Sequence, residues 1–142
     1  MLEVVNVFIP KLSENKFLTV KRASLDKVFG DMSALPGGGV EEGEDLKTTA
    51  RREVKEETGR NLVIISSEPV LVTSPMLLGQ QIKLYIFEGE FDDGDFNPSD
   101  SDISGVHWVD PKTFIDSLRK FGYPESEFPK FEEFLRDRGF RL

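Results

Sequence analysis

Three glutamates between residues 53 and 57 are the side chains of this sequence best placed to do chemistry together. On a helix at 100° per residue, Glu57 lies about 40° to one side of Glu53 and Glu56 about 60° to the other. Like charges at this spacing repel one another, and Lys55 points away from the shared face while Arg52 offsets only part of the repulsion. A hard divalent cation such as Mg²⁺ would relieve the rest, because it prefers carboxylate oxygens.

A glycine-rich segment, Leu35-Pro36-Gly37-Gly38-Gly39, precedes the glutamates. We expect it to break any regular element and to let the backbone approach a metal or a phosphate closely. An acidic helix face alone is usually just solvated surface. The glycine segment together with Arg52 favours a site for phosphate chemistry in which divalent cations stand between the carboxylates and an anionic ligand.

The elements that hold these residues follow from hydrophobic periodicity and from capping residues. A helix is predicted from Asp45 to Thr58, with Gly59 as a left-handed cap and with Ala50 and Val54 facing the core. Strands are predicted at Leu2–Ile9, Lys16–Lys21, Val63–Ile65, Val70–Thr73, Gln81–Phe91 and Val106–Val109, and two further helices at Pro111–Lys120 and Pro129–Arg138. The first two strands are expected to form a hairpin, and residues 92–104 are expected to form a loop. This order predicts an α/β fold, with a mixed β-sheet between helices.

Composition excludes several other kinds of site. The chain of 142 residues fits one domain, 1–142, and it has no Cys and only one histidine, His107, so disulfides, thiolate nucleophiles and His-rich zinc sites are excluded. A formal charge of -8 argues against polymeric nucleic acid as a partner. No apolar run reaches membrane-spanning length, and with no Cys we expect a cytoplasmic protein without membrane association.

The spacing of eight residues resembles the signature of a known family. Gly38, Glu44, Arg52-Glu53-Val54, Glu56-Glu57 and Gly59 stand at the offsets of the Nudix box, the loop-helix signature of the Nudix (MutT-like) hydrolases. Arg60 occupies the last position of the signature, where an aliphatic residue is usual, and Leu62 or Val63 would take over its packing.

This resemblance implies an α/β/α sandwich and hydrolysis of a pyrophosphate bond with Mg²⁺, or Mn²⁺ as a substitute. It implies that Glu53, Glu56 and Glu57 are metal ligands, one of them also the general base, with the Gly38 carbonyl in the same shell. Arg52 would hold the carboxylates, and Gly37, Gly39, Glu44 and Gly59 would support the geometry. Relatives often add a carboxylate from the loop before the last strand, for which Asp102 is the first candidate and Asp100 the second.

The resemblance also implies a substrate in which a nucleoside diphosphate is linked to another group, and the sequence leaves its identity open. Without an extra N-terminal domain, we expect a nucleoside triphosphate pyrophosphohydrolase that cleanses the nucleotide pool. Pro75, fifteen residues beyond the box, instead resembles the ADP-ribose pyrophosphatases, and nucleotide sugars remain open. Phe121, Tyr123 and Phe128 are candidates for a base-stacking pocket. An alternative of another functional class is a non-catalytic nucleotide-binding Nudix module. A homodimer is a candidate for the oligomeric state, because relatives frequently dimerise.

Overall fold

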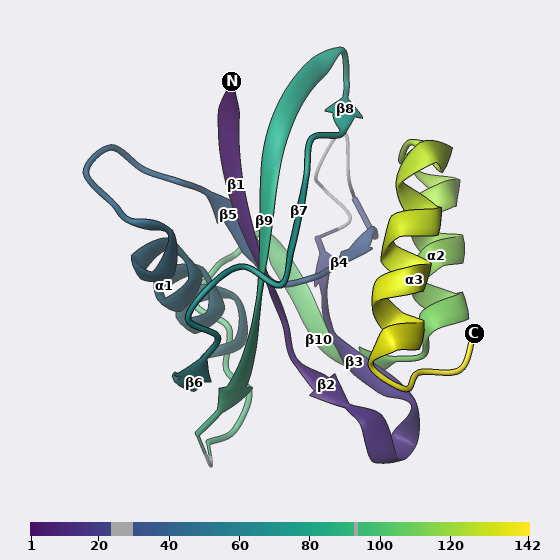
Figure 1. Ribbon diagram of the computed structural model, residues 1–142. Helices are drawn as coiled ribbons and strands as arrows, with labels where there is room; N and C mark the ends of the chain where they lie inside the picture. The colour runs from purple at the N-terminus through teal and green to yellow at the C-terminus, as the bar shows by residue number, and fades with distance from the viewer. Residues whose placement is uncertain (24–29, 93) are drawn as a thin grey trace.

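The computed structural model describes residues 1–23, 30–92 and 94–142, and its first sheet is built around two parallel neighbours (Figure 1). Strand β1 (Leu2–Phe8) runs parallel to β9 (Gln80–Phe91) and antiparallel to β5 (Gly37–Gly39). Three short strands pair antiparallel along β9, namely β6 (Leu62–Ile65), β7 (Leu71–Thr73) and β8 (Met76–Leu77). The prediction of a mixed sheet is therefore confirmed.

The second sheet is antiparallel and centres on β3 (Lys16–Arg22). Its other strands are β10 (Ile103–Val109), β2 (Pro10–Lys11) and β4 (Ser33–Ala34), and a 3₁₀ turn, η1 (Leu12–Glu14), joins β2 to β3. The predicted hairpin between the first two strands is wrong, because β1 pairs with β5 and β9 and the chain changes sheets at Pro10. Alternating side chains identify a strand but do not specify its partner.

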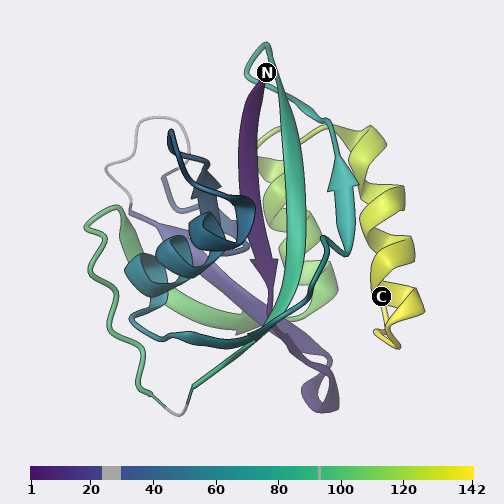
Figure 2. The ribbon, with the colours of Figure 1, turned by 60° about the vertical axis from the view of Figure 1, so that its left-hand side comes forward.

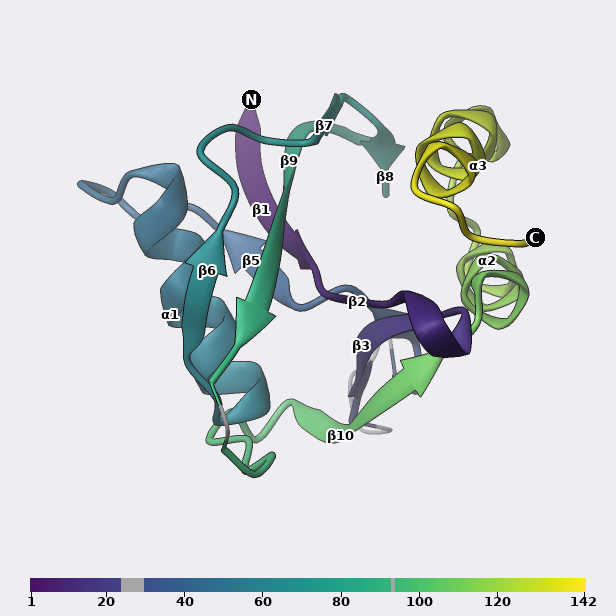
Figure 3. The ribbon, with the colours of Figure 1, turned by 60° about the horizontal axis from the view of Figure 1, so that its bottom comes forward.

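Helices cover both sides of the two sheets (Figure 2, Figure 3). Helix α1 (Leu46–Thr58) lies on one side, and α2 (Pro111–Lys120) and α3 (Phe128–Asp137) lie on the other. A short 3₁₀ helix, η2 (Glu125–Glu127), leads into α3. The arrangement is the α/β/α sandwich that was expected. Over the described ranges, none of the helices is both long and apolar enough to cross a membrane.

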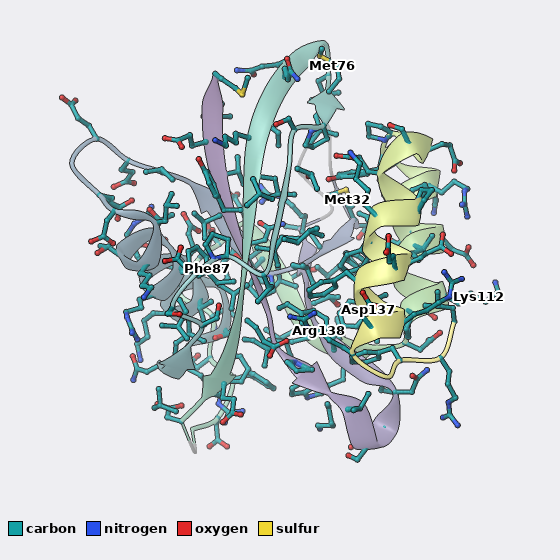
Figure 4. All side chains as sticks on the ribbon, in the orientation of Figure 1. Met32, Met76, Phe87, Lys112, Asp137 and Arg138 are labelled. Atoms are coloured by element: carbon teal, nitrogen blue, oxygen red, sulfur yellow. The ribbon has the colours of Figure 1, made fainter. Side chains whose placement is uncertain are left out.

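The core has two parts, one on each side of the first sheet. Phenylalanine rings fill the part beneath α2 and α3, where Phe8 and Phe17 pack against Phe131 and Phe134. The part beneath α1 contains Ala50 and Val54 of the helix, as predicted, together with Val5, Val7, Leu62 and Phe87 (Figure 4). Leu62 is 6% exposed and Val63 57%, so Leu62 supplies the packing that Arg60 cannot.

Two boundaries differ from the sequence predictions near the site. Gly37–Gly39 was expected to interrupt regular structure, but it forms β5, whose residues pair with Val4, Val5 and Asn6 of β1. Glycine has a low strand propensity, and here the backbone pairing with β1 overrides it. The loop expected at 92–104 ends at Asp102, because β10 begins at Ile103, where it pairs with Arg22 of β3. Residue 93 of this loop lies outside the described residues.

Candidate active site

The three glutamates of α1 lie on one face, as predicted, and they differ in exposure. Glu57 is 3% exposed, whereas the side chains of Glu53 and Glu56 are 13% and 44% exposed. Glu57 turns toward β5, where its Oε1 accepts a 2.8 Å hydrogen bond from the Gly37 N–H. The acidic face therefore runs from a buried carboxylate against the glycine strand to one that is open to solvent.

Arg52 joins the two outer glutamates to the loop before the helix. Its Nε donates to Oε2 of Glu44 over 2.7 Å, and its Nη1 donates to Oε1 of Glu53 over 2.8 Å and to Oε2 of Glu56 over 3.4 Å. Its Nη2 also donates to the Gly39 carbonyl over 3.3 Å. These charged hydrogen bonds fix the guanidinium and raise the pKa of Arg52, so it stays protonated.

Glu44 connects Arg52 to the start of α1. It accepts hydrogen bonds from the Thr49 hydroxyl and from the backbone N–H of Glu41. The bond from Arg52, followed by the one from Glu41, lowers the pKa of Glu44 to about 2. Asp45 is the N-cap of the helix, and its carboxylate accepts a hydrogen bond from the Thr48 N–H over 2.8 Å. The loop, the cap and the acidic face are thus one hydrogen-bonded unit.

The buried carboxylates have raised pKa values. Burial raises the pKa of Glu57 to about 8, the Gly37 N–H opposes this rise, and the charges of Glu53 and Asp100 add to it. Burial also raises the pKa of Glu53, against the lowering effect of Arg52. Both carboxyl groups therefore resist ionisation in the absence of a cation, and a bound cation would favour their ionised form.

Gly38 of β5 leaves room for the Glu53 carboxylate. A Cβ at this position would lie 2.5 Å from Oε1 and 2.6 Å from Cδ of Glu53. Carboxylate oxygens beside a bare backbone are donors that suit a hard cation such as Mg²⁺. Across the described ranges, no three acidic or histidine side chains already stand close enough together to form a finished metal site. The residues fit a divalent ion in the chemistry of their oxygen donors, while Glu53 and Glu56 are held by Arg52 and Glu57 by the Gly37 N–H.

The loop before β10 is anchored to the C-terminal end of α1. The backbone N–H groups of Ser99 and Asp100 donate to the Glu56 carbonyl over 2.9 Å and 3.1 Å. Asp100 raises the pKa of both Glu53 and Glu57 through its charge, whereas the exposed Asp102 donates its N–H to Oδ1 of Asp100. Of the two loop carboxylates considered from the sequence, Asp100 is the one whose charge acts on the helix glutamates.

Gly59 allows this loop to approach the helix. It caps α1 with φ +78°, a left-handed conformation that favours glycine. A Cβ there would collide with the backbone of Asn97, whose N–H donates to the Thr58 carbonyl over 2.8 Å. The left-handed cap was predicted from the sequence. The close passage of residues 94–100 was not, because it depends on tertiary packing.

A cavity of about 280 Å³ opens beside the acidic face. Glu57, Gly37 and Gly38 line it on the side of α1, and the rest of its lining is mostly apolar, with residues of β7, β9 and α2 among it. The predicted pocket residues Phe121, Tyr123 and Phe128 all line the same cavity. Pro75 does not line it; it is buried, and its carbonyl accepts from the Ile82 N–H.

Four polar residues of the cavity wall were missed by the sequence reasoning. They come from separate elements, and no local motif marks them: Asn6, Arg22, Thr73 and Glu127. Asn6 is a lone polar residue in an apolar stretch, which is a weak signal, whereas Arg22 and Glu127 lie among other polar residues and carry no such signal. Polar groups of this kind orient a ligand in a pocket whose walls are mostly hydrophobic.

This combination of fold and site defines a class of protein. An acidic helix face beside a glycine strand, next to a cavity that aromatic side chains also line, is an arrangement that suits an enzyme using divalent cations on a phosphate-bearing ligand. The comparison with known proteins names the family. The model of the NUDIX domain matches residues 2–128, and the chain therefore belongs to this family.

Relatives agree with this membership. The chain is 30% identical over 106 residues to the nucleoside triphosphatase NudI of Salmonella arizonae, covering 69% of this chain and 75% of that protein. It is 31% identical over 123 residues to the RNA pyrophosphohydrolase of Pelagibacter ubique, covering 76% of each. A NUDIX hydrolase from Nitrosomonas europaea has the same fold, with a TM-score of 0.76 at 18% identity, covering 99% of this chain and 93% of that one. The chain is a Nudix pyrophosphohydrolase, an enzyme of a family that generally uses divalent cations and nucleotide substrates.

Proposed function

We propose that this enzyme is a Mg²⁺-dependent nucleoside triphosphate pyrophosphohydrolase of nucleotide-pool cleansing. The observation that carries the proposal is the shared cavity, which Glu57 lines at one side and Phe121, Tyr123 and Phe128 at another. A triphosphate can extend toward the acidic face while its base lies among aromatic rings, to which a flat heterocycle stacks well. The name of the NudI relative supports the same substrate class. Pro75, the marker that resembles ADP-ribose pyrophosphatases, lies outside the cavity wall.

In this proposal Glu53, Glu56 and Glu57 would hold Mg²⁺, with the Gly38 carbonyl as a further ligand. When bound, the ion would neutralise phosphate charge and lower the pKa of a water. One of the three glutamates would act as the general base for the attacking water. Arg52 orients Glu53 and Glu56 through the bonds described above, and Glu44 fixes Arg52 in turn. The apolar walls keep bulk water away from the base side of the cavity.

We also propose Asp100, in preference to Asp102, as the carboxylate that the loop adds to the site. Its charge acts on Glu53 and Glu57, and two backbone bonds to the Glu56 carbonyl hold its segment against α1. Asp102 is exposed and supports Asp100 through its N–H. Both residues lie in the segment where the family resemblance favours such a carboxylate.

The test is a panel of substrates incubated with Mg²⁺, with Mn²⁺, and with EDTA. Nucleoside triphosphates, ADP-ribose, dinucleoside polyphosphates, nucleotide sugars and 5′-triphosphate RNA are compared by chromatography of their products. This readout is needed because ADP-ribose and nucleotide sugars give a nucleoside monophosphate and a sugar phosphate, without inorganic phosphate or pyrophosphate. We expect pyrophosphate and a nucleoside monophosphate from triphosphates, with activity in either metal and none in EDTA. A clear preference for ADP-ribose, nucleotide sugars or RNA would overturn the proposed substrate class while leaving the hydrolase in place.

The alternative of a non-catalytic nucleotide-binding module is separated by the Glu57→Gln variant. Loss of most turnover in this variant, with the nucleotide still bound, supports a role for Glu57 in the chemistry. Equal low activity in the variant and the wild type would exclude that role. Cytoplasmic location and dimerisation stay predictions, and size-exclusion chromatography with light scattering measures the second of them directly.

A further inference from the structure

A buried carboxylate stands in the wall of the cavity away from α1. Glu127 is 7% exposed, ends η2 and immediately precedes α3. It lines the same cavity as Glu57, although α1 and α3 lie on opposite sides of the sheets (Figure 1). Carboxylates are rarely this buried unless they are paired, so both oxygens of Glu127 need an account.

One of the two oxygens has a partner and the other does not. Oε2 accepts a 2.7 Å hydrogen bond from Lys130 Nζ. Oε1 is fully buried and has no hydrogen-bond partner within residues 1–23, 30–92 and 94–142. A carboxylate that begins a helix often caps a backbone N–H, but the Glu127 side chain makes no such bond. A buried acceptor without a donor costs free energy, which a bound N–H group would recover.

The surroundings of Glu127 suit a flat ring that carries N–H groups. Tyr123 and Phe128 lie 6.1 Å apart between ring centroids, and both line the cavity. Burial, and to a smaller extent the charge of Glu127, raises the pKa of the Tyr123 hydroxyl to about 12. Tyr123 thus stays a neutral hydroxyl beside an ionisable acceptor. Aromatic faces together with a carboxylate select a heterocycle by stacking and by its donor edge.

We propose that Glu127 is a specificity-determining residue that selects a nucleobase with two adjacent N–H donors on its edge, as guanine has. The inference rests on the proposed nucleoside triphosphate substrate and names which base it carries. A carboxylate only accepts hydrogen bonds, and guanine presents its ring N1–H beside its 2-amino group. Adenine and cytosine place an amine beside a ring acceptor, and uracil places its N–H between two carbonyl oxygens. These three bases therefore set an acceptor against the carboxylate.

The test compares substrates that differ by the 2-amino group alone. We measure kcat/KM for the triphosphates of guanosine and inosine with the wild type, with Glu127→Gln and with Glu133→Gln. Hydrogen bonds to charged groups contribute enough to predict a preference of about ten-fold or more for guanosine in the wild type. Glu127→Gln should reduce this ratio several-fold. Glu133 is exposed on α3 and outside the cavity wall, so its variant should keep the ratio.

The ratio is taken within one sample, so a partly unfolded variant does not change it. An unchanged ratio in Glu127→Gln, or a wild type that does not prefer guanosine, would overturn the inference. If the wild type hydrolyses no triphosphate, the proposed function fails and the inference is decided by calorimetric binding of the two monophosphates. Tighter binding of guanosine than inosine monophosphate, lost in Glu127→Gln, supports it. Equal binding or no binding by the wild type refutes it.

Discussion

Replacing Glu57 by glutamine should stabilise the metal-free protein at neutral and alkaline pH while removing its response to Mg²⁺. The wild-type carboxyl is 3% exposed, and burial raises its pKa from 4.5 to about 8. Glutamine has nearly the same volume, and its carbonyl oxygen can still accept the N–H of Gly37, which now lies 2.8 Å from Glu57 Oε1. The variant therefore keeps the local packing and removes the cost of burying a charge.

The direction of the pH effect follows from proton binding in the two states. In the unfolded chain the carboxyl ionises near pH 4.5, whereas in the folded, metal-free protein it keeps its proton up to about pH 8. Between these values the folded state binds more protons, so the free energy of unfolding of the wild type falls as the pH rises. The stabilisation is fully present below pH 4.5 and is lost above about pH 8.

The size of the effect has an upper bound. A tenfold change in proton affinity corresponds to about 1.4 kcal/mol, so the raised pKa corresponds to at most about 5 kcal/mol. Relaxation and water entry around the ionised carboxylate reduce this, and we expect roughly 2 to 4 kcal/mol. The lowered pKa of Glu44, about 2, affects stability in a different pH range. Its stabilisation is present above pH 4.5 and is lost only as the pH falls toward 2.

Urea unfolding in EDTA at pH 5 and pH 9 measures the difference directly. The free energy of unfolding of Glu57→Gln minus that of the wild type should increase between these two pH values. Glu133→Gln, an exposed carboxyl removed in the same way, should show little increase. Added Mg²⁺ should stabilise the wild type by mass action, by about 2.7 kcal/mol at a hundred times its dissociation constant, and stabilise the variant far less. An equal difference at pH 5 and pH 9 would refute the burial argument.

Four other perturbations test the supports of the site. Gly38→Ala places a Cβ 2.5 Å from Glu53 Oε1 and should lower kcat at least ten-fold, whereas Gly39→Ala, which meets open space, should not. Gly59→Ala should lower the free energy of unfolding by about 2 kcal/mol or more, from strain plus a collision with Asn97, whereas Gly43→Ala, with a similar φ in open space, should lose only about 1 kcal/mol. Asp100→Asn should reduce Mg²⁺-dependent turnover more than Asp102→Asn. Removal of divalent ions with EDTA should abolish turnover, and added Mg²⁺ should restore it.

Each of these has a contrary outcome. Equal kcat in Gly38→Ala and Gly39→Ala would show that the space beside Glu53 is unimportant. Equal losses of unfolding free energy in Gly59→Ala and Gly43→Ala, measured by urea unfolding, would show that the collision with Asn97 does not contribute. A stronger effect of Asp102→Asn in the turnover assay would restore the first candidate from the sequence. Turnover that persists in EDTA would separate the acidic face from the chemistry.

The acidic face could be predicted from the sequence because helical periodicity is a local property. Positions 53, 56 and 57 share a face of any α-helix, and Ala50 and Val54 identify the buried face beside it. The N-cap Asp45 and the C-cap Gly59 are equally local, since they satisfy the backbone groups at the helix ends. The residues of the family signature lie in one short segment, from Gly38 to Gly59, and the fold and the enzyme class follow from that signature.

The partners of these residues depended on contacts between segments far apart in the chain. Gly37–Gly39 became a strand because β1 was available to pair with it, and that strand turns Glu57 away from Arg52 toward the Gly37 N–H. Backbone pairing of this kind outweighs the low strand propensity of glycine. Asp100 reaches the helix because Gly59 leaves space for its loop.

The cavity was decided entirely by tertiary packing. Phe114, Phe128 and Phe131 belong to the core and also line the cavity, whereas Phe134 belongs to the core and is not part of the cavity lining. The packing of α2 and α3 on the sheets decides this, and sequence spacing does not predict it. Glu127 became a buried acceptor because its neighbours fold around it, while in the sequence it is one glutamate among many. The sequence by itself determined the fold class and the acidic helix face, because these follow from local periodicity. Only the folded chain determined which strand and loop meet that face and what shape of ligand fits beside it, because burial and pairing arise between distant segments.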